Sequence, residues 1–307
     1  MNTSYLLELA HQRLDCGQLD GAMDALRQLL GEDPDCAQAH ALLAFCLLDL
    51  RRLHAAKHEA RLALAIEPEL ELALHAAAAV ALASRQFKAA RQYIDRLLGV
   101  NPFRPGYHRL LADLQRLQRK PREQLQALTR ALELEPDGPD SLAAMADYHR
   151  DQGARDKAEH FASQALAIQP DHAGALICMG FLLLRRGELE AAREHAVWVL
   201  QHDASDVQAL YLMSAVKARR NPLLGTWWRY NSWMMELGSV RSIIVLLALF
   251  VCYRAGVIFA NQQGYEMLAE GVQWAWLALV LYTFAAPQMF KRSLEKELAG
   301  VKLSRDF

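Results

Sequence analysis

Paired cysteines and an excess of either charge are missing from this sequence. The five cysteines are odd in number and include no CxxC pair, so we expect free core thiols in a reducing compartment rather than a disulfide framework or a metal site. The 34 basic and 35 acidic residues give a net charge of −1, which provides no overall positive field for nucleic acid. No cofactor is predicted, and we expect no nucleic-acid partner.

Catalytic motifs and a signal peptide are also absent. The chain contains no P-loop, no GxSxG and no HExxH, so we predict no enzyme activity for this chain alone. The N-terminal stretch has neither a basic start nor a long apolar run. It therefore predicts no signal peptide, and we expect the region that follows to stay in the compartment of its synthesis.

What the sequence does have is a proline that recurs. Pro34, Pro68, Pro102, Pro136 and Pro170 are 34 residues apart, and Ala204 occupies the next position of the series. A fixed interval of this length predicts a repeat architecture. Counting back from each proline gives six repeats: 3–36, 37–70, 71–104, 105–138, 139–172 and 173–206.

Three other positions of the repeat keep one kind of side chain. The eighth position is small throughout: Ala10, Ala44, Ala78, Ala112, Ala146 and Gly180. The twentieth position is small in all repeats but the fourth: Ala22, Ala56, Ala90, Gln124, Ala158 and Ala192. The twenty-eighth position is always leucine: Leu30, Leu64, Leu98, Leu132, Leu166 and Leu200. Small residues at fixed places predict two helices that cross closely, and the leucine is expected to pack against the next repeat.

Each repeat is therefore predicted to be a helix, a turn and a second helix. The turn falls near Gly17, Gly153 and Gly187, where glycine adopts positive φ at low cost, and the recurring proline stops the second helix. Over residues 3–206 this pattern resembles the tetratricopeptide repeat family. The resemblance implies an all-α fold, a right-handed α-solenoid of six helix pairs. Residues 207–220 are expected to form a capping helix, as repeat arrays require.

The sequence departs from the family pattern at several positions. Leucine or histidine replaces the bulky aromatic that is frequent at the fourth position: Leu6, His40, Leu74, His108, Leu142 and Leu176. We expect His40 and His108 to be partly buried packing residues rather than ligands. The fourth repeat also has Pro121 at the start of its second helix and Gln124 at a small position.

In the resembling family the first helices line a concave groove that binds protein partners. Helical spacing places the fifth, ninth and twelfth positions of each repeat on one face. The candidate groove residues are Leu7, His11, Phe45, Leu48, His75, Arg109, Asp113, Arg116, Asp147, Arg150, Ile177 and Phe181. Phe45 and Phe181 would anchor a peptide or helix, and the arginines would bind acidic groups. The alternative is that these residues only pack neighbouring helices or pair with one another.

One known kind of ligand is not expected. Family members that bind chaperone tails hold the terminal carboxylate with lysine and asparagine at groove positions. Here the fifth position carries no lysine and the ninth carries no asparagine. A chaperone C-terminal tail is therefore a poor candidate partner.

Beyond the repeats, the sequence predicts a transmembrane hairpin. The apolar stretches 240–259 and 271–290 have 20 residues each, which gives helices of about 30 Å, the thickness of a bilayer core. The alternative is a pair of buried helices in a small soluble domain. Lysine and arginine flank both stretches and are absent from the connector 261–270, so the repeats and the tail 291–307 are expected in the cytoplasm and the connector outside.

The segment 221–239 is expected to lie on the cytoplasmic leaflet, or to pack on the last repeat as a linker. It contains four aromatic residues suited to headgroup depth: Trp227, Trp228, Tyr230 and Trp233. Arg254 is the one charge well inside a predicted span. Intramembrane charges are candidates for function, although snorkelling or pairing with Glu266 or Glu270 is the favoured interpretation here.

Two functional hypotheses follow. The first is a membrane-anchored scaffold, bacterial in compositional style and held at the inner membrane, that recruits a cytoplasmic protein through the groove. The second is an accessory subunit of an integral membrane complex for transport, secretion or envelope synthesis, docked through the hairpin. An enzyme that is completed by a partner is a third and weaker hypothesis.

Overall fold

The structure is a computed structural model. It describes residues 3–15, 18–203 and 206–220, and then 250–251, 253–259, 262, 267, 270–271, 273–274 and 276–277. Every regular element within these residues is a helix. The chain divides into two compact units, Met1–Pro170 and Asp171–Phe307.

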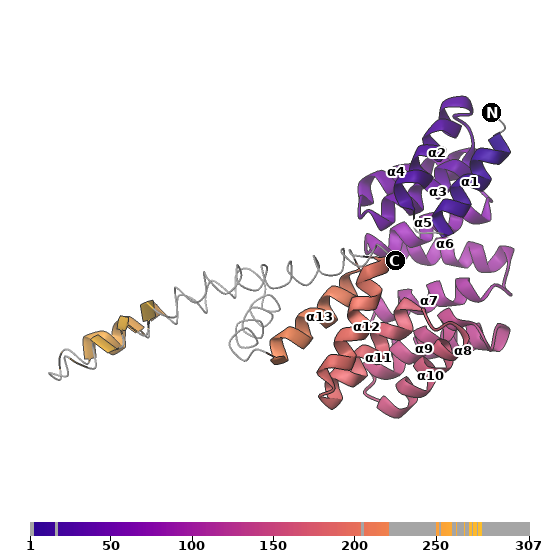
Figure 1. The fold of residues 1–307 in the computed structure, drawn as a ribbon. Helices are drawn as coiled ribbons and strands as arrows, with labels where there is room; N and C mark the ends of the chain where they lie inside the picture. The colour runs from indigo at the N-terminus through magenta and orange to yellow at the C-terminus, as the bar shows by residue number, and fades with distance from the viewer. Residues whose placement is uncertain are drawn as a thin grey trace, which may run out of the picture. The chain divides into compact units, whose positions relative to one another are not determined.

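The first unit contains the helices of five repeats (Figure 1). They are α1 (Thr3–Asp15), α2 (Leu19–Glu32), α3 (Ala37–Asp49), α4 (Leu53–Ile66), α5 (Glu71–Ala83), α6 (Phe87–Val100), α7 (Pro105–Leu117), α8 (Pro121–Leu134), α9 (Pro139–Asp151) and α10 (Arg155–Ile168). The odd-numbered helices begin 34 residues apart. The even-numbered helices end two residues before each recurring proline, as expected for a residue that lacks a backbone N–H.

Proline also begins helices in this unit. Pro105, Pro121 and Pro139 lie at the first position of α7, α8 and α9. The missing N–H costs nothing there, because the first turn has no acceptor for it, and the fixed φ of proline favours the helix. Pro121 therefore starts α8 without disturbing it.

The helices of the first unit pack as antiparallel pairs in a row. Within each repeat the two helices contact each other, and the first helices α1, α3, α5, α7 and α9 also contact one another in series. Residues at both small positions are buried in every repeat, including Gln124 and Gly180. The expectation that helices cross closely at these positions agrees with this burial, since a larger side chain would separate the backbones.

The second unit contains α11 (Ala173–Arg186), α12 (Leu189–His202) and α13 (Val207–Arg220). Both α11 and α12 contact α13. A Cβ added to Gly180 of α11 would lie 2.4 Å from Cδ2 of Leu212 in α13. The glycine at this small position therefore lets the side chain of Leu212 pack directly against α11.

The C-terminal predictions are only partly within reach of the structure. The aromatic segment with Trp227, Trp228, Tyr230 and Trp233, the start of the stretch 240–259, the end of the stretch 271–290 and the tail 291–307 lie outside the described residues. The described residues between 250 and 277 are helical. Among the residues that the structure does describe, no helix combines the length and the apolar character that crossing a bilayer requires.

Candidate functional site

The predicted groove residues of the first unit lie on α1, α3, α5, α7 and α9. At the α1 end, Leu7 and Leu48 are half-buried and pack against the core between α1, α2 and α3, whereas His11 is exposed. The apolar pair thus contributes to packing between neighbouring repeats. His11 is the predicted residue of α1 that is most open to solvent.

Three aromatic rings connect α3, α5 and α7. The ring of His75 lies 5.1 Å from that of Phe45 and 5.8 Å from that of Tyr107, both in edge-to-face geometry. Phe45 and His75 were predicted groove residues, and Tyr107 was not. The sequence carried no signal for Tyr107, because it stands at the third position of its repeat, outside the predicted groove face.

Hydrogen bonding fixes the end of this aromatic series. The hydroxyl of Tyr107 donates to Glu71, and Arg104 lies 3.3 Å from the same carboxylate and 5.7 Å from the Tyr107 ring centre. Burial and the neighbouring Glu71 raise the pKa of Tyr107, so the hydroxyl remains a donor. Burial and the cations Arg104 and Arg109 lower the pKa of His75, so its ring is neutral near pH 7.

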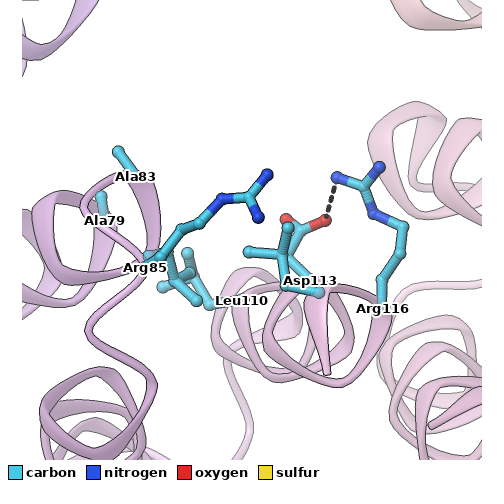
Figure 2. Close-up of a pocket in the computed structure, with 8 residues that line it drawn as sticks. Ala79, Ala83, Arg85, Leu110, Asp113 and Arg116 are labelled. Atoms are coloured by element: carbon cyan, nitrogen blue, oxygen red, sulfur yellow. Dashed lines mark hydrogen bonds and ion pairs between the residues drawn. The ribbon is translucent and has the colours of Figure 1, made fainter. Parts of the chain in front are cut away.

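Beside the rings, an open hollow of about 430 Å³ lies between α5 and α7 (Figure 2). Its lining is apolar except for one carboxylate and two guanidinium groups: Ala79, Leu82, Ala83, Arg85, Leu110, Asp113, Arg116 and Leu117. Figure 2 shows the side chains of Arg85 and Arg116 on either side of Asp113. The hollow therefore combines leucine surface with a local excess of positive charge.

Of the two guanidinium groups in the hollow, Arg116 pairs with Asp113 and Arg85 does not. Nη2 of Arg116 lies 3.3 Å from Oδ1 of Asp113. Partial desolvation raises the pKa of this carboxyl, although the Asp113 side chain is still 52% exposed, and Arg116 and Arg109 oppose that shift. Arg85 is exposed, and its side chain forms no hydrogen bond or ion pair with any residue that the structure describes. It is therefore available to an acidic group of a ligand.

Arg85 was missed by sequence reasoning, and its backbone is unusual. Its φ is +54°, and Arg51 and Arg119 have φ of +57° and +58°. Gly153 and Gly187 occupy the same position of later repeats with φ of +77° and +90°. An L-residue in this left-handed region costs about 1–2 kcal/mol. The sequence did contain a signal for these arginines. They are 34 residues apart and occupy the turn position of the repeat that Gly17, Gly153 and Gly187 occupy in other repeats.

The other predicted arginines of the groove have partners within the protein. Nη2 of Arg109 lies 2.7 Å from Oδ2 of Asp140 on α9, and Nη1 of Arg150 lies 2.8 Å from Oδ1 of Asp147. Both arginine side chains are largely buried. A ligand would have to compete with these internal carboxylates, so the hollow is the better anion site.

The remaining predicted residues lie apart from this hollow in the sequence. In the second unit Ile177 is buried, and the half-buried ring of Phe181 lies 5.9 Å from that of Tyr211 on α13. Near the C-terminus Arg254 is exposed. Close to it, the rings of Tyr253 and Trp276 stack at 4.7 Å, which places the helical residues around 253 and 276 side by side.

The comparisons with known proteins concern the repeats. A family model described as tetratricopeptide repeat matches residues 13–69. A comparison with curated proteins gave no match. The match of the family model is limited to the second helix of repeat 1 and to repeat 2, together with the end of α1.

Solved structures resemble a larger part of the chain. A tetratricopeptide repeat protein from Parabacteroides merdae has a TM-score of 0.60 and 17% identity over 70% of this chain and 84% of its own. A chain of the APC/C hetero-tetramer Cut9-Hcn1 has a TM-score of 0.56 and 14% identity over 70% of this chain, which is 43% of its own length. PilW, a type IV pilus biogenesis factor, has a TM-score of 0.50 and 16% identity over 69% of this chain and 98% of its own.

These likenesses establish the fold. The prediction of an all-α, tetratricopeptide-type helical array is confirmed by the described helices and by the solved structures. Because all identities are below 20%, the resemblance reaches the fold and not the ligand.

Proposed function

We propose that this protein is a scaffold that recruits a protein partner through the first helices of its Met1–Pro170 unit, and that it is attached to a membrane through residues 240–290. The observation that carries the recruiting role is the hollow between α5 and α7. There the side chain of Arg85 lies beside an apolar surface and has no partner among the described residues. A ligand segment with an acidic residue next to an apolar one matches this chemistry. The aromatic residues Phe45 and His75 extend the apolar surface towards α3.

Membrane attachment is supported by composition and by one set of contacts. The stretches 240–259 and 271–290 are each long enough for a bilayer core. The stacked rings of Tyr253 and Trp276 bring one residue of each stretch together. An antiparallel hairpin with this register brings both basic flanks to the same side of the membrane.

The recruiting role is tested by photo-crosslinking from the hollow. A photoreactive amino acid at Leu110 should capture a partner in native membranes, and the same group at Gln118, outside the hollow, should not. Arg85→Gly is expected to lower capture about tenfold or more, because it removes a charge-assisted hydrogen bond worth about 1.5–3 kcal/mol. Phe45→Ala and Arg116→Glu should also lower it.

The control is Arg130→Ala. It removes an exposed arginine of α8, but Arg130 lies neither in the hollow lining nor in a turn, so capture should be unchanged. Capture that is equal in Arg85→Gly and in the unaltered protein would show that the hollow is not the partner site.

A second role, an accessory subunit of an integral membrane complex, would place recognition in residues 240–290 instead. Replacing these residues by an unrelated membrane anchor separates the two roles. A scaffold keeps the partner captured from Leu110 after the exchange, whereas an accessory subunit loses its partners.

A further inference from the structure

The loops of the first unit differ in charge according to which end of the helix pairs they join. The three turns between the first and second helices of repeats 2, 3 and 4 carry five cations and no carboxylate: Arg51, Arg52, Arg85, Arg119 and Lys120. We call these five residues the basic edge. The first turns of α6 and α8 add Lys88, Arg122 and the carboxylate Glu123 next to it, and α3 ends at Asp49.

The corners that join one repeat to the next have the opposite charge. In the first unit they carry six carboxylates and one arginine, Arg104. We call the six carboxylates the acidic edge: Asp33, Asp35, Glu67, Glu69, Glu135 and Asp137. Helices of 13 or 14 residues separate the two edges, so they lie about 20 Å apart at opposite ends of the helix pairs.

The basic edge is continuous, and its side chains have no partners within the part of the chain that the structure describes. Because α3 contacts α5 and α5 contacts α7, the C-terminal ends of these helices, where the three turns begin, lie in series. All five side chains are exposed, and none forms a hydrogen bond or ion pair with the residues that the structure describes. Leu50 and Leu117, next to these cations, are each at least 36% exposed.

We propose that the basic edge, except for Arg85 in the hollow, binds the headgroups of anionic phospholipids and holds the first unit against the membrane surface. Clustered lysine and arginine with adjacent exposed leucine is the combination that attracts a protein to an anionic leaflet and lets apolar side chains enter its interface. The acidic edge is repelled by the same surface, so the contact has one orientation. This inference rests on the proposed membrane attachment, which keeps the lipid close to the repeats.

The test uses the full chain reconstituted into vesicles of phosphatidylcholine, with or without phosphatidylserine. Phenylglyoxal modifies accessible arginine and acetic anhydride modifies accessible lysine, and mass spectrometry reports the rate at each residue. Modification of Arg51, Arg119 and Lys120 should be several-fold slower in vesicles that contain phosphatidylserine, and high salt should restore the faster rates. Carbodiimide labelling of Glu67 and Asp137 should be equal in the two vesicle types.

Variants with altered edges make the test specific. Each cation near an anionic leaflet contributes about a fivefold gain in binding, so Arg52→Gln with Lys120→Gln should weaken the contact about 25-fold and abolish the protection of Arg51 and Arg119. The matched control, Glu67→Gln with Asp137→Asn, should keep that protection. Neither Arg52 nor Lys120 has positive φ or lines the hollow.

Two outcomes would overturn the proposal. Equal arginine modification in both vesicle types would show that the edge does not contact lipid. The second outcome is that residues of both edges are protected from modification without lipid, and that this protection rises with protein concentration. It would show that the basic edge of one copy binds the acidic edge of another. Failure of membrane attachment is measured separately, since a chain without a membrane hairpin is released from vesicles by alkaline carbonate.

Discussion

At the scale of single residues, the arginines with positive φ are the least expected feature of the chain. Arg119 has φ of +58°, where glycine would avoid a cost of about 1–2 kcal/mol. Glycine in turn loses about 0.5–1 kcal/mol more conformational entropy on folding than a residue with a side chain. Arg119→Gly should therefore stabilise the protein by about 0.5–1 kcal/mol, measured as the free energy of unfolding in urea.

The reverse change at the equivalent position is the control. No atom lies within 4 Å of a Cβ added to Gly153, whose φ is +77°. The Cβ added in Gly153→Arg therefore meets no neighbouring atom, and the main expected effect comes from the backbone. It should destabilise the protein by an amount similar to the gain in Arg119→Gly, and a loss of stability in Arg119→Gly would contradict this account.

At the scale of helices, the edge-to-face rings of Phe45, His75 and Tyr107 link α3, α5 and α7. The pKa of His75 is below its ordinary value of 6.5, so the unfolded chain binds this proton more readily than the folded one. The contribution of neutral His75 to stability is therefore complete above pH 6.5 and is lost as the pH falls towards the folded pKa. Protonation would also add a charge beside Arg104 and Arg109.

His75→Phe tests this pH dependence. Phenylalanine keeps an aromatic ring between Phe45 and Tyr107 but does not titrate. Between pH 7.5 and pH 5.5, the free energy of unfolding should decrease less in His75→Phe than in the unaltered chain. A residual decrease is expected from His149 and His195, because burial lowers their pKa values as well. An unchanged decrease in the variant would show that His75 does not contribute.

Most of the fold was accessible from the sequence, because its signals are periodic. The recurring proline and the small residues at the eighth and twentieth positions predict helix pairs, and both small positions are buried in the structure. The pairs that define the site are not periodic. Tyr107 with Glu71, and Arg109 with Asp140, join residues of neighbouring repeats 36 and 31 apart. Sequence spacing alone does not determine such contacts.

The hollow illustrates the same limit. The groove pattern predicted Asp113 and Arg116, which face it from α7. It did not predict Arg85, because the groove pattern covers only positions on the first helices, and Arg85 lies in the turn that follows α5. Ile177 was predicted as a groove residue but is buried in the second unit. The same repeat position can line a groove in one repeat and pack against a neighbouring helix in another.

At the scale of the whole molecule, the proposed membrane hairpin makes a clear topological prediction. A cysteine at position 263, in a chain whose five native cysteines are replaced, should react with an impermeant maleimide in intact cells, because the connector is expected outside. A cysteine at position 304 should react only after the membrane is opened. The opposite pattern would reverse the proposed orientation, and two positions that behave alike would exclude the proposed hairpin.

The packing of each helix against its near neighbours in sequence also has a consequence for synthesis. Contacts in the first unit join helices of the same repeat or of adjacent repeats, and local contacts of this kind form quickly. A ribosome needs roughly 2–7 s to add one 34-residue repeat at about 5–20 residues per second. Each helix pair can therefore fold while the next is being made, so the first unit is complete before the apolar stretches 240–259 and 271–290 leave the ribosome.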